Sequence, residues 1–590
     1  MSQLKMYLKV MPSEYPGTLN GFTFRRYNKT DEDILAWAEI CRVGLLGDAA
    51  DKPHEIFDEN FTSRDDFRPE NLFFVMLNGK PVATICILVE ADGTGRVHMV
   101  GALPECRGRG VGKFLMDIAN ACLYECGCHR AFLTTDEHRI PAVKSYLRAY
   151  FLPVLYEDDM EGRWIAWLTE NGYKNVAAVD DEGNYIKTLC QSDAENKIKI
   201  GIFGARRGRG IAQAAVLSDK AYISAVCDCD ESTYAGISVY CRNETKYFKD
   251  FDEFIESGLD AVVLSNYFHE HAEYAVKALE KGIHVLSETM PAVTMADCVA
   301  ICRASEKSGA IYMLAENYAY FSTIDKLTDL YAGGTLGDVI YSEGEYVHPM
   351  SHEEYVHYTP ATTHWRALMP SGYYLSHSLA PLMRVTNDVP VAVNARSIYS
   401  DTLRQEREGE PVKDVASIML CTMSRGSLAR ITGWAKFGGH GNWYRFACAK
   451  GSAETVRGNE DKIRICYNSW DAPEGAETAS VTQVEFPFDG DKAKMCGHAG
   501  GDYYVTLEFI NCILEGRQPY FNAYRSCAMS AVAILGWRSS LHNGVEYKIP
   551  DFSDEEERKA YENDRLSPFP DKNGNVNYPC TKYDADKFDI

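Results

Sequence analysis

The stretch that constrains this chain most is residues 197–228, which reads as a strand, a glycine turn, a helix and a second strand. The apolar run 199–203 leads into Gly204 and Gly208, and the apolar residues that follow have helical spacing. A second apolar run ends at Asp228. Glycines at such a turn let the backbone approach a pyrophosphate, and the next helix offers free N–H groups. The stretch therefore predicts a dinucleotide site.

The residues around this turn indicate which dinucleotide binds. An acid about 20 to 25 residues after the turn can hold ribose hydroxyls, so Asp228 favours NAD over NADP. The usual second glycine of the fingerprint stands as Arg206, or is lost through a one-residue shortening. We expect the cofactor contacts here to come from Gly204, Arg206, Arg207, Gly208 and Asp228. The alternative is an ordinary strand-to-helix turn without a ligand.

Length and composition narrow the class of protein. A chain of 590 residues predicts about three folding units. The net charge of -23 disfavours nucleic acid or an anionic membrane as the main partner and favours small molecules. The 19 cysteines are scattered without a CxxC repeat, which favours buried thiols in a reducing compartment over disulfides or a zinc site. With neither a signal peptide nor an 18-residue apolar run, we expect a cytoplasmic protein without a membrane partner or a metal.

A second glycine-rich turn lies in the first 170 residues. The predicted strand 97–100 leads into the turn 107–112, and an amphipathic helix starts at Lys113. Successive backbone N–H groups at a helix N-terminus form a cradle for an anion.

This region resembles the GNAT acetyltransferases, whose motif R-x-x-G-x-G is matched by Arg107, Gly110 and Gly112. The resemblance implies acetyl-CoA as cofactor, with its pyrophosphate on this loop and a backbone N–H of the preceding strand directed at the thioester. It also implies that Tyr146 protonates the leaving thiolate; the alternative for Tyr146 is a half-buried helix tyrosine. The alternative for the whole region is a degenerate fold that binds CoA weakly or not at all. No residue identifies the acyl acceptor. The implied cofactor-binding residues are Val100, Arg107, Gly108, Arg109, Gly110, Val111 and Gly112.

Strand and helix patterns alternate beyond Asp228 and predict a doubly wound parallel sheet, in which ligands bind at the carboxyl ends of the strands. Asn266, Glu288 and Asn317 each follow a predicted strand, so we expect them to lie along one lip. The polar segment 171–196 before this sheet is expected to be a linker.

From residue 197 onward the chain resembles the Gfo/Idh/MocA oxidoreductases, which use NAD or NADP on sugars and cyclitols. The loop from Asn266 to His271 and the stretch ending at Glu288 match that family, which implies that Asn266, His271, Glu288 and Asn317 contact the cofactor. Where the catalytic lysine normally stands, this chain has Thr289. Its loss weakens the interpretation as an ordinary dehydrogenase.

The second half of the chain resembles one branch of that family, the NAD-dependent glycosidases typified by bacterial α-N-acetylgalactosaminidase. Tyr374 and His377 match its Tyr-x-x-His, and the stretch 497–503 matches its Gly-His-Gly-Gly-x-Asp-Tyr. In such enzymes NAD takes hydride from a ring carbon, the glycosidic group leaves, and the hydride returns. The resemblance implies that His377 handles the hydroxyl proton and Tyr374 the carbon acid. Residues expected to bind the sugar are Trp365, Arg366, His498 and Asp502.

Two alternatives without a catalytic role stay open. His377 can be a histidine at a helix start whose hydrogen bonds are made by the backbone, and Arg366 can form a surface ion pair. The predicted fold class is α/β, with an α+β domain at the end of the chain. A GNAT-like domain (1–170) is followed by the linker (171–196), a Rossmann domain (197–320) and an α+β domain with an open, mostly antiparallel sheet (321–590). We expect a homo-oligomer with a sugar or glycoside substrate and an unknown acyl acceptor. The competing hypothesis is a non-catalytic nucleotide-binding sensor or scaffold.

Overall fold

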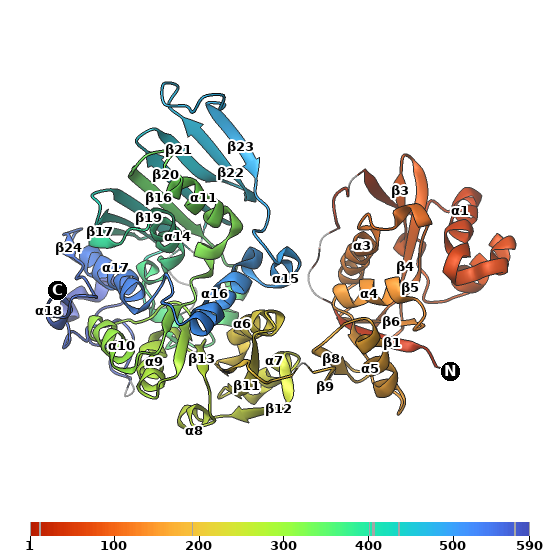
Figure 1. The fold of residues 1–590 in the computed structure, drawn as a ribbon, viewed down its shortest axis with the longest axis horizontal. Helices are drawn as coiled ribbons and strands as arrows, with labels where there is room; N and C mark the ends of the chain where they lie inside the picture. The colour runs from red at the N-terminus through yellow and green to blue at the C-terminus, as the bar shows by residue number, and fades with distance from the viewer. Residues whose placement is uncertain are drawn as a thin grey trace. The chain divides into compact units, whose positions relative to one another are not determined.

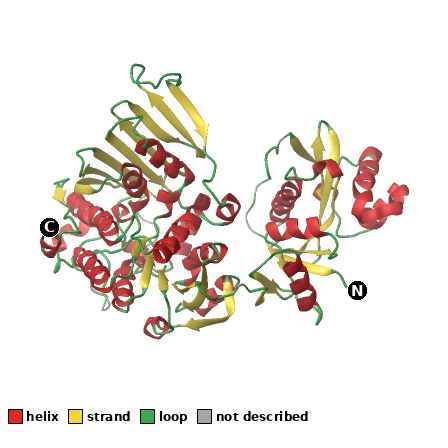
Figure 2. Cartoon of the chain, in the orientation of Figure 1, coloured by secondary structure: helices red, strands yellow, loops and turns green. Residues whose placement is uncertain are grey.

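The chain folds into two compact units, residues 1–193 (unit 1) and 194–590 (unit 2). The structure is a computed structural model that describes residues 2–10, 13, 15–19, 21–191, 193–400, 402–403, 408–434, 437–571 and 574–588. Figure 1 shows the ribbon, and Figure 2 colours it by secondary structure.

Unit 1 is built on a seven-stranded sheet in the order β2-β3-β4-β5-β6-β1-β7. The hairpin between β3 and β4 turns at Asn78 and Gly79, whose φ angles of 51° and 78° suit a tight two-residue connection. The strands are β1 (Leu4–Lys9), β2 (Phe22–Arg26), β3 (Leu72–Leu77), β4 (Lys80–Val89), β5 (Gly95–Ala102), β6 (Arg130–Thr135) and β7 (Leu152–Pro153).

The first strand, β1, lies inside this sheet between β6 and β7. Leu4, Met6 and Leu8 alternate with more exposed residues, and all three are buried. An alternating pattern of this kind is what a strand with one buried face requires. The predicted domain 1–170 includes these residues, but no strand was predicted for them.

Helices cover both faces of the unit 1 sheet. One core packs residues of α3 and α5 against the sheet, and a separate core gathers Trp37, Phe57 and Phe61 on the other face. The helices are α1 (Asp31–Cys41), α2 (Pro53–Phe57), α3 (Val111–Glu125), α4 (Ile140–Arg148) and α5 (Met160–Glu170).

The segment expected to be a linker contains a hairpin, β8 (Val176–Val179) and β9 (Tyr185–Leu189). Ala178 and Leu189 are buried in the core of unit 1, and Val179 forms a bridge with Val154. The hairpin therefore belongs to unit 1, which ends at residue 193.

Unit 2 begins with a six-stranded sheet in the order β12-β11-β10-β13-β14-β15, in which every pair is parallel. The predicted doubly wound sheet is confirmed. The strands are β10 (Ile198–Phe203), β11 (Ala221–Cys227), β12 (Cys241–Phe248), β13 (Ala261–Leu264), β14 (His284–Ser287) and β15 (Tyr312–Leu314), and the helices are α6 (Ala205–Leu217), α7 (Tyr234–Ser238), α8 (Phe251–Ile255), α9 (His271–Glu280) and α10 (Met295–Ser308).

The rest of unit 2 is organised on a nine-stranded sheet in the order β23-β22-β21-β20-β16-β19-β18-β17-β24. Among the described strands of this sheet, only β16 and β19 pair in parallel, so the predicted mostly antiparallel sheet is confirmed. The strands are β16 (Val339–Val347), β17 (Pro390–Ile398), β18 (Ala416–Met423), β19 (Leu428–Trp434), β20 (Gly441–Cys448), β21 (Gly451–Val456), β22 (Asn459–Tyr467), β23 (Ala479–Gln483) and β24 (Tyr547–Lys548).

Helices join the two sheets of unit 2 into one body with a shared core. Figure 1 shows α14 and α17 beside the nine-stranded sheet. A backbone N–H of β17 donates to Ser539 on α17 over 2.9 Å. The helices are α11 (Ser322–Ala332), α12 (His352–Tyr358), α13 (Trp365–Leu368), α14 (Ser376–Thr386), α15 (Gly490–Met495), α16 (Gly501–Glu515), α17 (Ala523–Leu541) and α18 (Glu555–Lys559).

The C-terminal segment wraps unit 2. Arg558 is buried and pairs with Glu306 over 2.6 Å, while Arg538 pairs with Asp564 over 2.6 Å. The ring of Phe569 lies 5.7 Å from that of Phe268, at the edge of the parallel sheet. The acidic tail is therefore fixed to the body of the unit through ion pairs and an aromatic anchor.

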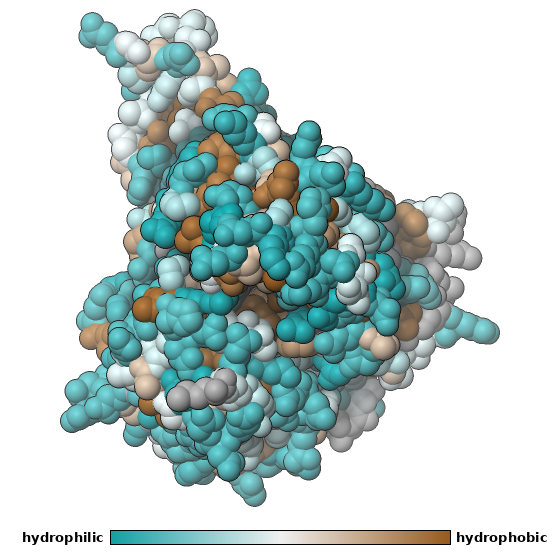
Figure 3. All heavy atoms as spheres, turned by 90° about the vertical axis from the view of Figure 1, so that its right-hand side faces the viewer, coloured by the Kyte–Doolittle hydropathy of each residue, from teal (hydrophilic) through white to brown (hydrophobic). Residues whose placement is uncertain are grey.

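All the cysteines fall in the described ranges, and each is a free thiol. Figure 3 shows a face of the molecule on which hydrophilic side chains predominate and hydrophobic ones form small patches. No helix among the described residues is long and apolar enough to cross a bilayer.

Candidate active sites

The turn after β10 brings α6 close to the parallel sheet. Gly204 precedes α6 with a φ of +92°, and a Cβ there would lie 2.4 Å from the carbonyl oxygen of Ser265. A Cβ at Gly208 would lie 2.3 Å from the side chain of Ile202. Both positions therefore require glycine, and α6 begins at the carboxyl edge of the sheet, as a dinucleotide site requires.

Asp228 lies beside this turn at the end of β11. One carboxylate oxygen accepts the N–H of Ala205 in the first turn of α6 over 2.8 Å, and the other accepts the N–H of Asp230 over 2.9 Å. This is the place from which an acid reaches a ribose hydroxyl in dinucleotide sites. Arg206 is exposed on the same turn.

Arg207 links three parts of unit 2 at the strand ends. Its guanidinium lies 2.6 Å from Glu288, which follows β14, and 3.0 Å from Asp502 on α16. Asp502 also accepts from the amide of Asn317 over 2.8 Å and lies 3.0 Å from Nδ1 of His498. Five of the predicted site residues therefore form one polar network.

The two carboxyl groups that pair with Arg207, those of Glu288 and Asp502, have pKa values shifted in opposite directions. Burial raises the pKa of Glu288, and the guanidinium of Arg207 only partly offsets this effect. Burial acts in the same direction on Asp502, but the hydrogen bond with His498 and the charge of Arg207 outweigh it and hold the pKa of Asp502 well below its usual range. Asp502 is therefore a fixed negative charge, whereas Glu288 is able to carry a proton.

His377 lies beside this network at the start of α14. Its Nδ1 is 2.5 Å from a carboxylate oxygen of Glu316, which is fully buried after β15. A carboxylate in this position fixes the imidazole and stabilises the charge that the ring gains when its other nitrogen accepts a proton. The contact is with a side chain, so His377 is not a histidine satisfied by backbone alone.

Three tyrosines surround His377. The ring of Tyr318 lies 4.3 Å from the imidazole, that of Tyr346 4.9 Å and that of Tyr374 5.3 Å. Burial raises the pKa of Tyr346, so this phenol stays protonated. The structure thus brings the predicted pair Tyr374 and His377 together.

Glu316, Tyr318 and Tyr346 were not among the predicted site residues. Glu316 and Tyr318 flank Asn317, which was predicted, at the carboxyl end of β15. A carboxylate at a strand end next to a predicted site residue was the signal that could have identified Glu316. Tyr346 lies on β16, outside the motifs of the sequence.

Trp365 and Arg366 lie in a separate aromatic group. Trp365 stacks on Phe268 at 5.1 Å, and Phe268 lies 6.4 Å from Tyr374. The guanidinium of Arg366 lies over Trp365 at 4.5 Å, and among the described residues we find no contact of this guanidinium with His377 or Asp502. Arg366 therefore adjoins the site through aromatic rings.

His271 holds two loops of the site together. Its Nδ1 lies 2.9 Å from the carbonyl oxygen of Met290 and its Nε2 3.3 Å from that of Asn266, and the side chain is buried. Both ring nitrogens face backbone, so the contact of His271 with a cofactor would be indirect. This histidine positions Asn266.

Several buried polar atoms at the strand ends have no hydrogen-bond partner among the described residues. They are Oδ1 of Asn266, Oδ1 of Asn317 and Oε2 of Glu316. Buried acceptors are normally paired, so a ligand with hydroxyl and amide donors fits here. With the close approach at Gly204, these residues fit NAD, which Asn266, Asn317, Glu288 and Asp228 would hold.

The candidate site of unit 1 lies where β5 leaves β6. Only Gly95 and Arg96 of β5 pair with β6, so the segment 97–102 diverges from its neighbour. Val100 lies in this splayed segment, where its backbone is free of β6. The splay opens a gap into which an extended ligand can insert its own hydrogen-bonding groups.

The loop after β5 leads into α3. Gly108 and Gly110 have φ angles of +70° and +81°, and a Cβ at Gly112 would lie 2.8 Å from the hydroxyl of Ser145. The guanidinium of Arg109 lies over the ring of Phe22 at 4.3 Å. Val111 begins the helix, so its N–H is one of those that an α-helix leaves without an internal acceptor. The loop fits an anion such as a pyrophosphate.

Tyr146 lies on α4 with 7% of its surface exposed. Burial raises the pKa of Tyr146 to about 12. The phenol is therefore protonated at neutral pH, as a proton donor to a leaving thiolate must be.

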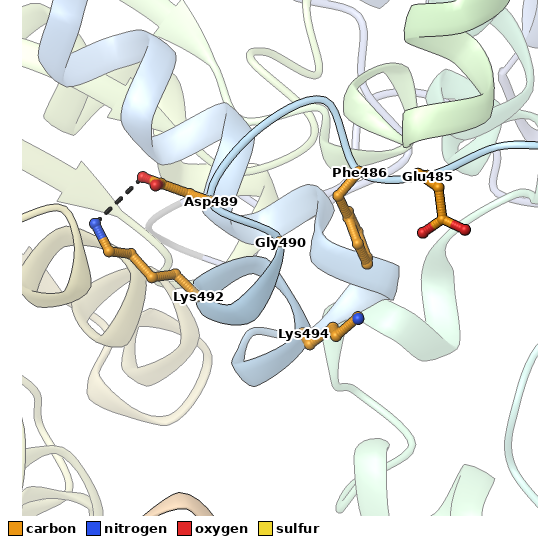
Figure 4. A pocket seen from close by; sticks show the side chains of 6 residues that line it. All are labelled: Glu485, Phe486, Asp489, Gly490, Lys492 and Lys494. Atoms are coloured by element: carbon orange, nitrogen blue, oxygen red, sulfur yellow. Dashed lines mark hydrogen bonds and ion pairs between the residues drawn. The ribbon is translucent and has the colours of Figure 1, made fainter. Parts of the chain in front are cut away.

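Two cavities lie away from these residues. One of about 480 Å³ is formed by the segment before His498, where Lys492 pairs with Asp489 over 3.2 Å, as Figure 4 shows. Tyr503 donates to Asp489 over 2.7 Å. The other, of about 660 Å³, is in unit 1 at the C-terminal end of α3 and includes Cys126. Neither is lined by the strand-end residues of unit 2 or by the turn 107–112.

Three family models match the chain. Residues 34–151 match the acetyltransferase (GNAT) family. Residues 198–316 match the oxidoreductase family with an NAD-binding Rossmann fold. Residues 485–558 match the C-terminal domain of glycosyl hydrolase 109.

Relatives and solved structures resemble the chain over a little more than half of its length. An alpha-N-acetylgalactosaminidase of Shewanella oneidensis is 20% identical over 343 residues, which are 54% of this chain and 73% of the relative. A glycosyl hydrolase family 109 protein of Shewanella pealeana is 21% identical over 395 residues, covering 60% of this chain and 85% of the relative. The structure of a levoglucosan dehydrogenase in complex with NADH and L-sorbose is similar with a TM-score of 0.52 and 15% identity, covering 60% of this chain and all of that one (100%).

These matches confirm the predicted resemblances. The chain is an enzyme that joins a GNAT acetyltransferase domain, which implies acetyl-CoA, to an NAD-dependent oxidoreductase domain of the Gfo/Idh/MocA type that carries the C-terminal domain of glycosyl hydrolase family 109.

Proposed function

We propose that unit 2 cleaves a glycoside by transient oxidation of a ring hydroxyl. The observation that carries the proposal is the buried pair of Glu316 and His377, 2.5 Å apart, at the carboxyl ends of the parallel strands. A histidine backed by a buried carboxylate is suited to taking a hydroxyl proton. When bound, NAD supplies an acceptor for the hydride of the sugar and returns it, so no net oxidation occurs.

In this mechanism each group of the site transfers a proton or stabilises a charge. His377 takes the hydroxyl proton, and Glu316 stabilises the imidazolium that results. Tyr374, 5.3 Å from His377 between ring centroids, acts in its phenolate form and removes the proton from the neighbouring carbon, and the glycosidic group leaves as the alcohol. Water then adds to the double bond that is left, which completes the hydrolysis. Arg207 links Asp502 to Glu288 at the strand ends, and Glu288, one of the residues that would hold NAD, is the carboxyl group there that is able to carry a proton.

The absence of lysine at position 289 supports cleavage over one-way oxidation. The cation of this site comes instead from Arg207, whose charge is divided between Glu288 and Asp502. A guanidinium keeps its proton at every physiological pH, so it cannot act as the acid or base of an alcohol oxidation. The proton chemistry is thereby left to His377 and Tyr374.

The name of the Shewanella oneidensis relative makes α-linked N-acetylgalactosamine the first sugar to test. A panel of 4-nitrophenyl glycosides should show phenolate release without NADH accumulation, and His377→Ala should abolish it. Release that consumes added NAD stoichiometrically would refute the redox-neutral version. Unchanged turnover by His377→Ala would remove this residue from the site.

For unit 1 we propose acetyl transfer from acetyl-CoA to an amine, with Tyr146 as proton donor to the leaving thiolate. The splayed strand and the loop before α3 support it. The competing function is a sensor or scaffold that binds both cofactors without turnover. Turnover separates the two: glycoside cleavage or amine acetylation by the purified protein excludes the scaffold, whereas NAD that co-purifies, detected by mass spectrometry of gently denatured protein, without either activity favours it.

A further inference from the structure

A row of side chains extends the site of unit 2 away from His377. β16 and β20 pair antiparallel, so directly opposed residues lie on the same face. Gly344 lies against α14, because a Cβ there would be 2.0 Å from the carbonyl oxygen of Ser378. Tyr444, opposite Gly344, donates its hydroxyl to the carbonyl oxygen of His377 over 2.7 Å. This face of the two strands is therefore directed at the catalytic helix.

The next opposed pair on this face is Tyr346 and Asn442. The ring of Tyr346 lies 4.9 Å from that of His377. The Oδ1 atom of Asn442 is buried and has no hydrogen-bond partner within the part of the chain that the structure describes. A buried acceptor without a donor costs free energy, so a ligand hydroxyl or N–H group here would be stabilising.

Two imidazoles continue the row to the solvent. His348 follows β16 directly and His440 precedes β20 directly, and their ring centroids are 4.7 Å apart. The ring of Tyr346 is 6.0 Å from that of His348. Burial and the neighbouring His440 lower the pKa of His348, so this ring is neutral near pH 7 and offers one donor and one acceptor.

We propose that Asn442, His348 and His440 form a second sugar subsite, the outer subsite, which binds the leaving-group ring of a glycoside whose first ring lies at His377. The inference rests on the proposed glycoside cleavage. The row begins at the imidazole of His377 and ends at the exposed His440, so its polar groups lead from the position of the first ring toward solvent. A neutral, hydroxylated ring fits its donors and acceptors, whereas the nearby carboxylate of Glu354 disfavours an acidic ring.

The test compares a substrate that reaches the outer subsite with one that does not. Methyl N-acetyl-α-galactosaminide has a leaving group too small to reach Asn442, whereas a disaccharide of α-N-acetylgalactosamine on galactose reaches it. In the NAD-loaded full chain, Asn442→Ala should lower kcat/KM for the disaccharide about tenfold, the effect of losing roughly one hydrogen bond. Turnover of the methyl glycoside should stay within about twofold of wild type.

Matched variants guard against a fold defect. His440→Gln changes an exposed side chain and should also lower kcat/KM for the disaccharide but not for the methyl glycoside. Asn394→Ala, on β17 of the same sheet, should leave both substrates unaffected, because Asn394 is opposed to the exposed Leu420 on the outer face. Equal losses on both substrates, or no preference of the wild type for the disaccharide, would overturn the proposal.

Calorimetry separates the subsite from the function. If the NAD-loaded protein binds the disaccharide about tenfold more tightly than the methyl glycoside and Asn442→Ala removes the difference, the subsite stands even without turnover. Absence of turnover on both would then refute only the proposed cleavage. Equal binding of the two sugars would refute the subsite.

Discussion

The exchange Glu316→Gln tests the chemistry of the larger unit most directly. Glutamine has the shape of glutamate and its oxygen can still accept from Nδ1 of His377, so the exchange removes the charge and keeps the geometry. The contact of 2.5 Å places the two charge centres about 4 Å apart once the imidazole is protonated. At an effective dielectric constant of about 20 their attraction is roughly 4 kcal/mol.

A loss of about 4 kcal/mol in the transition state corresponds to roughly a thousandfold fall in kcat. KM should change little, because glutamine keeps the shape of the side chain and its hydrogen bond to the imidazole that faces the substrate. The assay is phenolate release from the best 4-nitrophenyl glycoside, together with the NAD content of the purified variant, which should equal that of the wild type.

The matched control is Glu343→Gln. Glu343 is also buried, with 8% exposure, and pairs with Arg430 over 2.7 Å on the same sheet, away from His377. It should retain full kcat. A kcat of Glu316→Gln within threefold of the wild-type value would refute the role of the charge. An equal loss of kcat in Glu343→Gln would show that both variants lose activity through general destabilisation.

Three further outcomes are expected. Gly204→Ala should lose co-purified NAD, measured by mass spectrometry, because its Cβ would lie 2.4 Å from a backbone oxygen; Gly236→Ala on α7, whose Cβ would lie 3.9 Å from the side chain of Arg209, should keep most of it. Tyr146→Phe should lower the rate of acetyl transfer about a hundredfold with little change in the KM for acetyl-CoA, followed by the mass of the acetylated amine; an unchanged rate would exclude the phenol as the acid. Burial raises the pKa of Asp414 in the folded protein to about 6, above its value in the unfolded chain. The free energy of unfolding should therefore rise as the pH falls from 7 toward 4, by up to roughly 3 kcal/mol. Urea unfolding of Asp414→Asn should show a flatter pH dependence than that of the wild type.

Much of the fold follows from local patterns. The turns at 107–112 and 204–208 were identified because a glycine turn between a strand and a helix is written within a few residues. The strand ends at Asn266, Glu288 and Asn317 were identified because each polar residue directly follows an apolar run. In the structure Glu288 pairs with Arg207, Arg207 pairs with Asp502, and Asp502 accepts from Asn317, so Glu288 and Asn317 belong to one network.

The rest depends on contacts between distant segments, which a local pattern does not contain. Nothing in the sequence near Arg207 predicts that its guanidinium bridges Glu288 and Asp502. Asp502 follows Arg207 by nearly three hundred residues. Tyr346 and Asn442 come to His377 only through the pairing of β16 with β20. The placement of Phe569 against Phe268 likewise requires the tail to fold back over the sheet.

The position of β1 has a consequence for how unit 1 acquires its structure. Lys9 pairs with Arg130, and Tyr7 pairs with Leu152. The first strand can therefore pair only when segments more than a hundred residues later have folded against it. Such non-local pairing slows folding, and a shortened chain that starts at residue 34, where the acetyltransferase match begins, would leave β6 with an unpaired edge. Fragments intended for separate expression of the acetyltransferase should therefore retain residues 4–9, or they will expose a strand edge that invites aggregation.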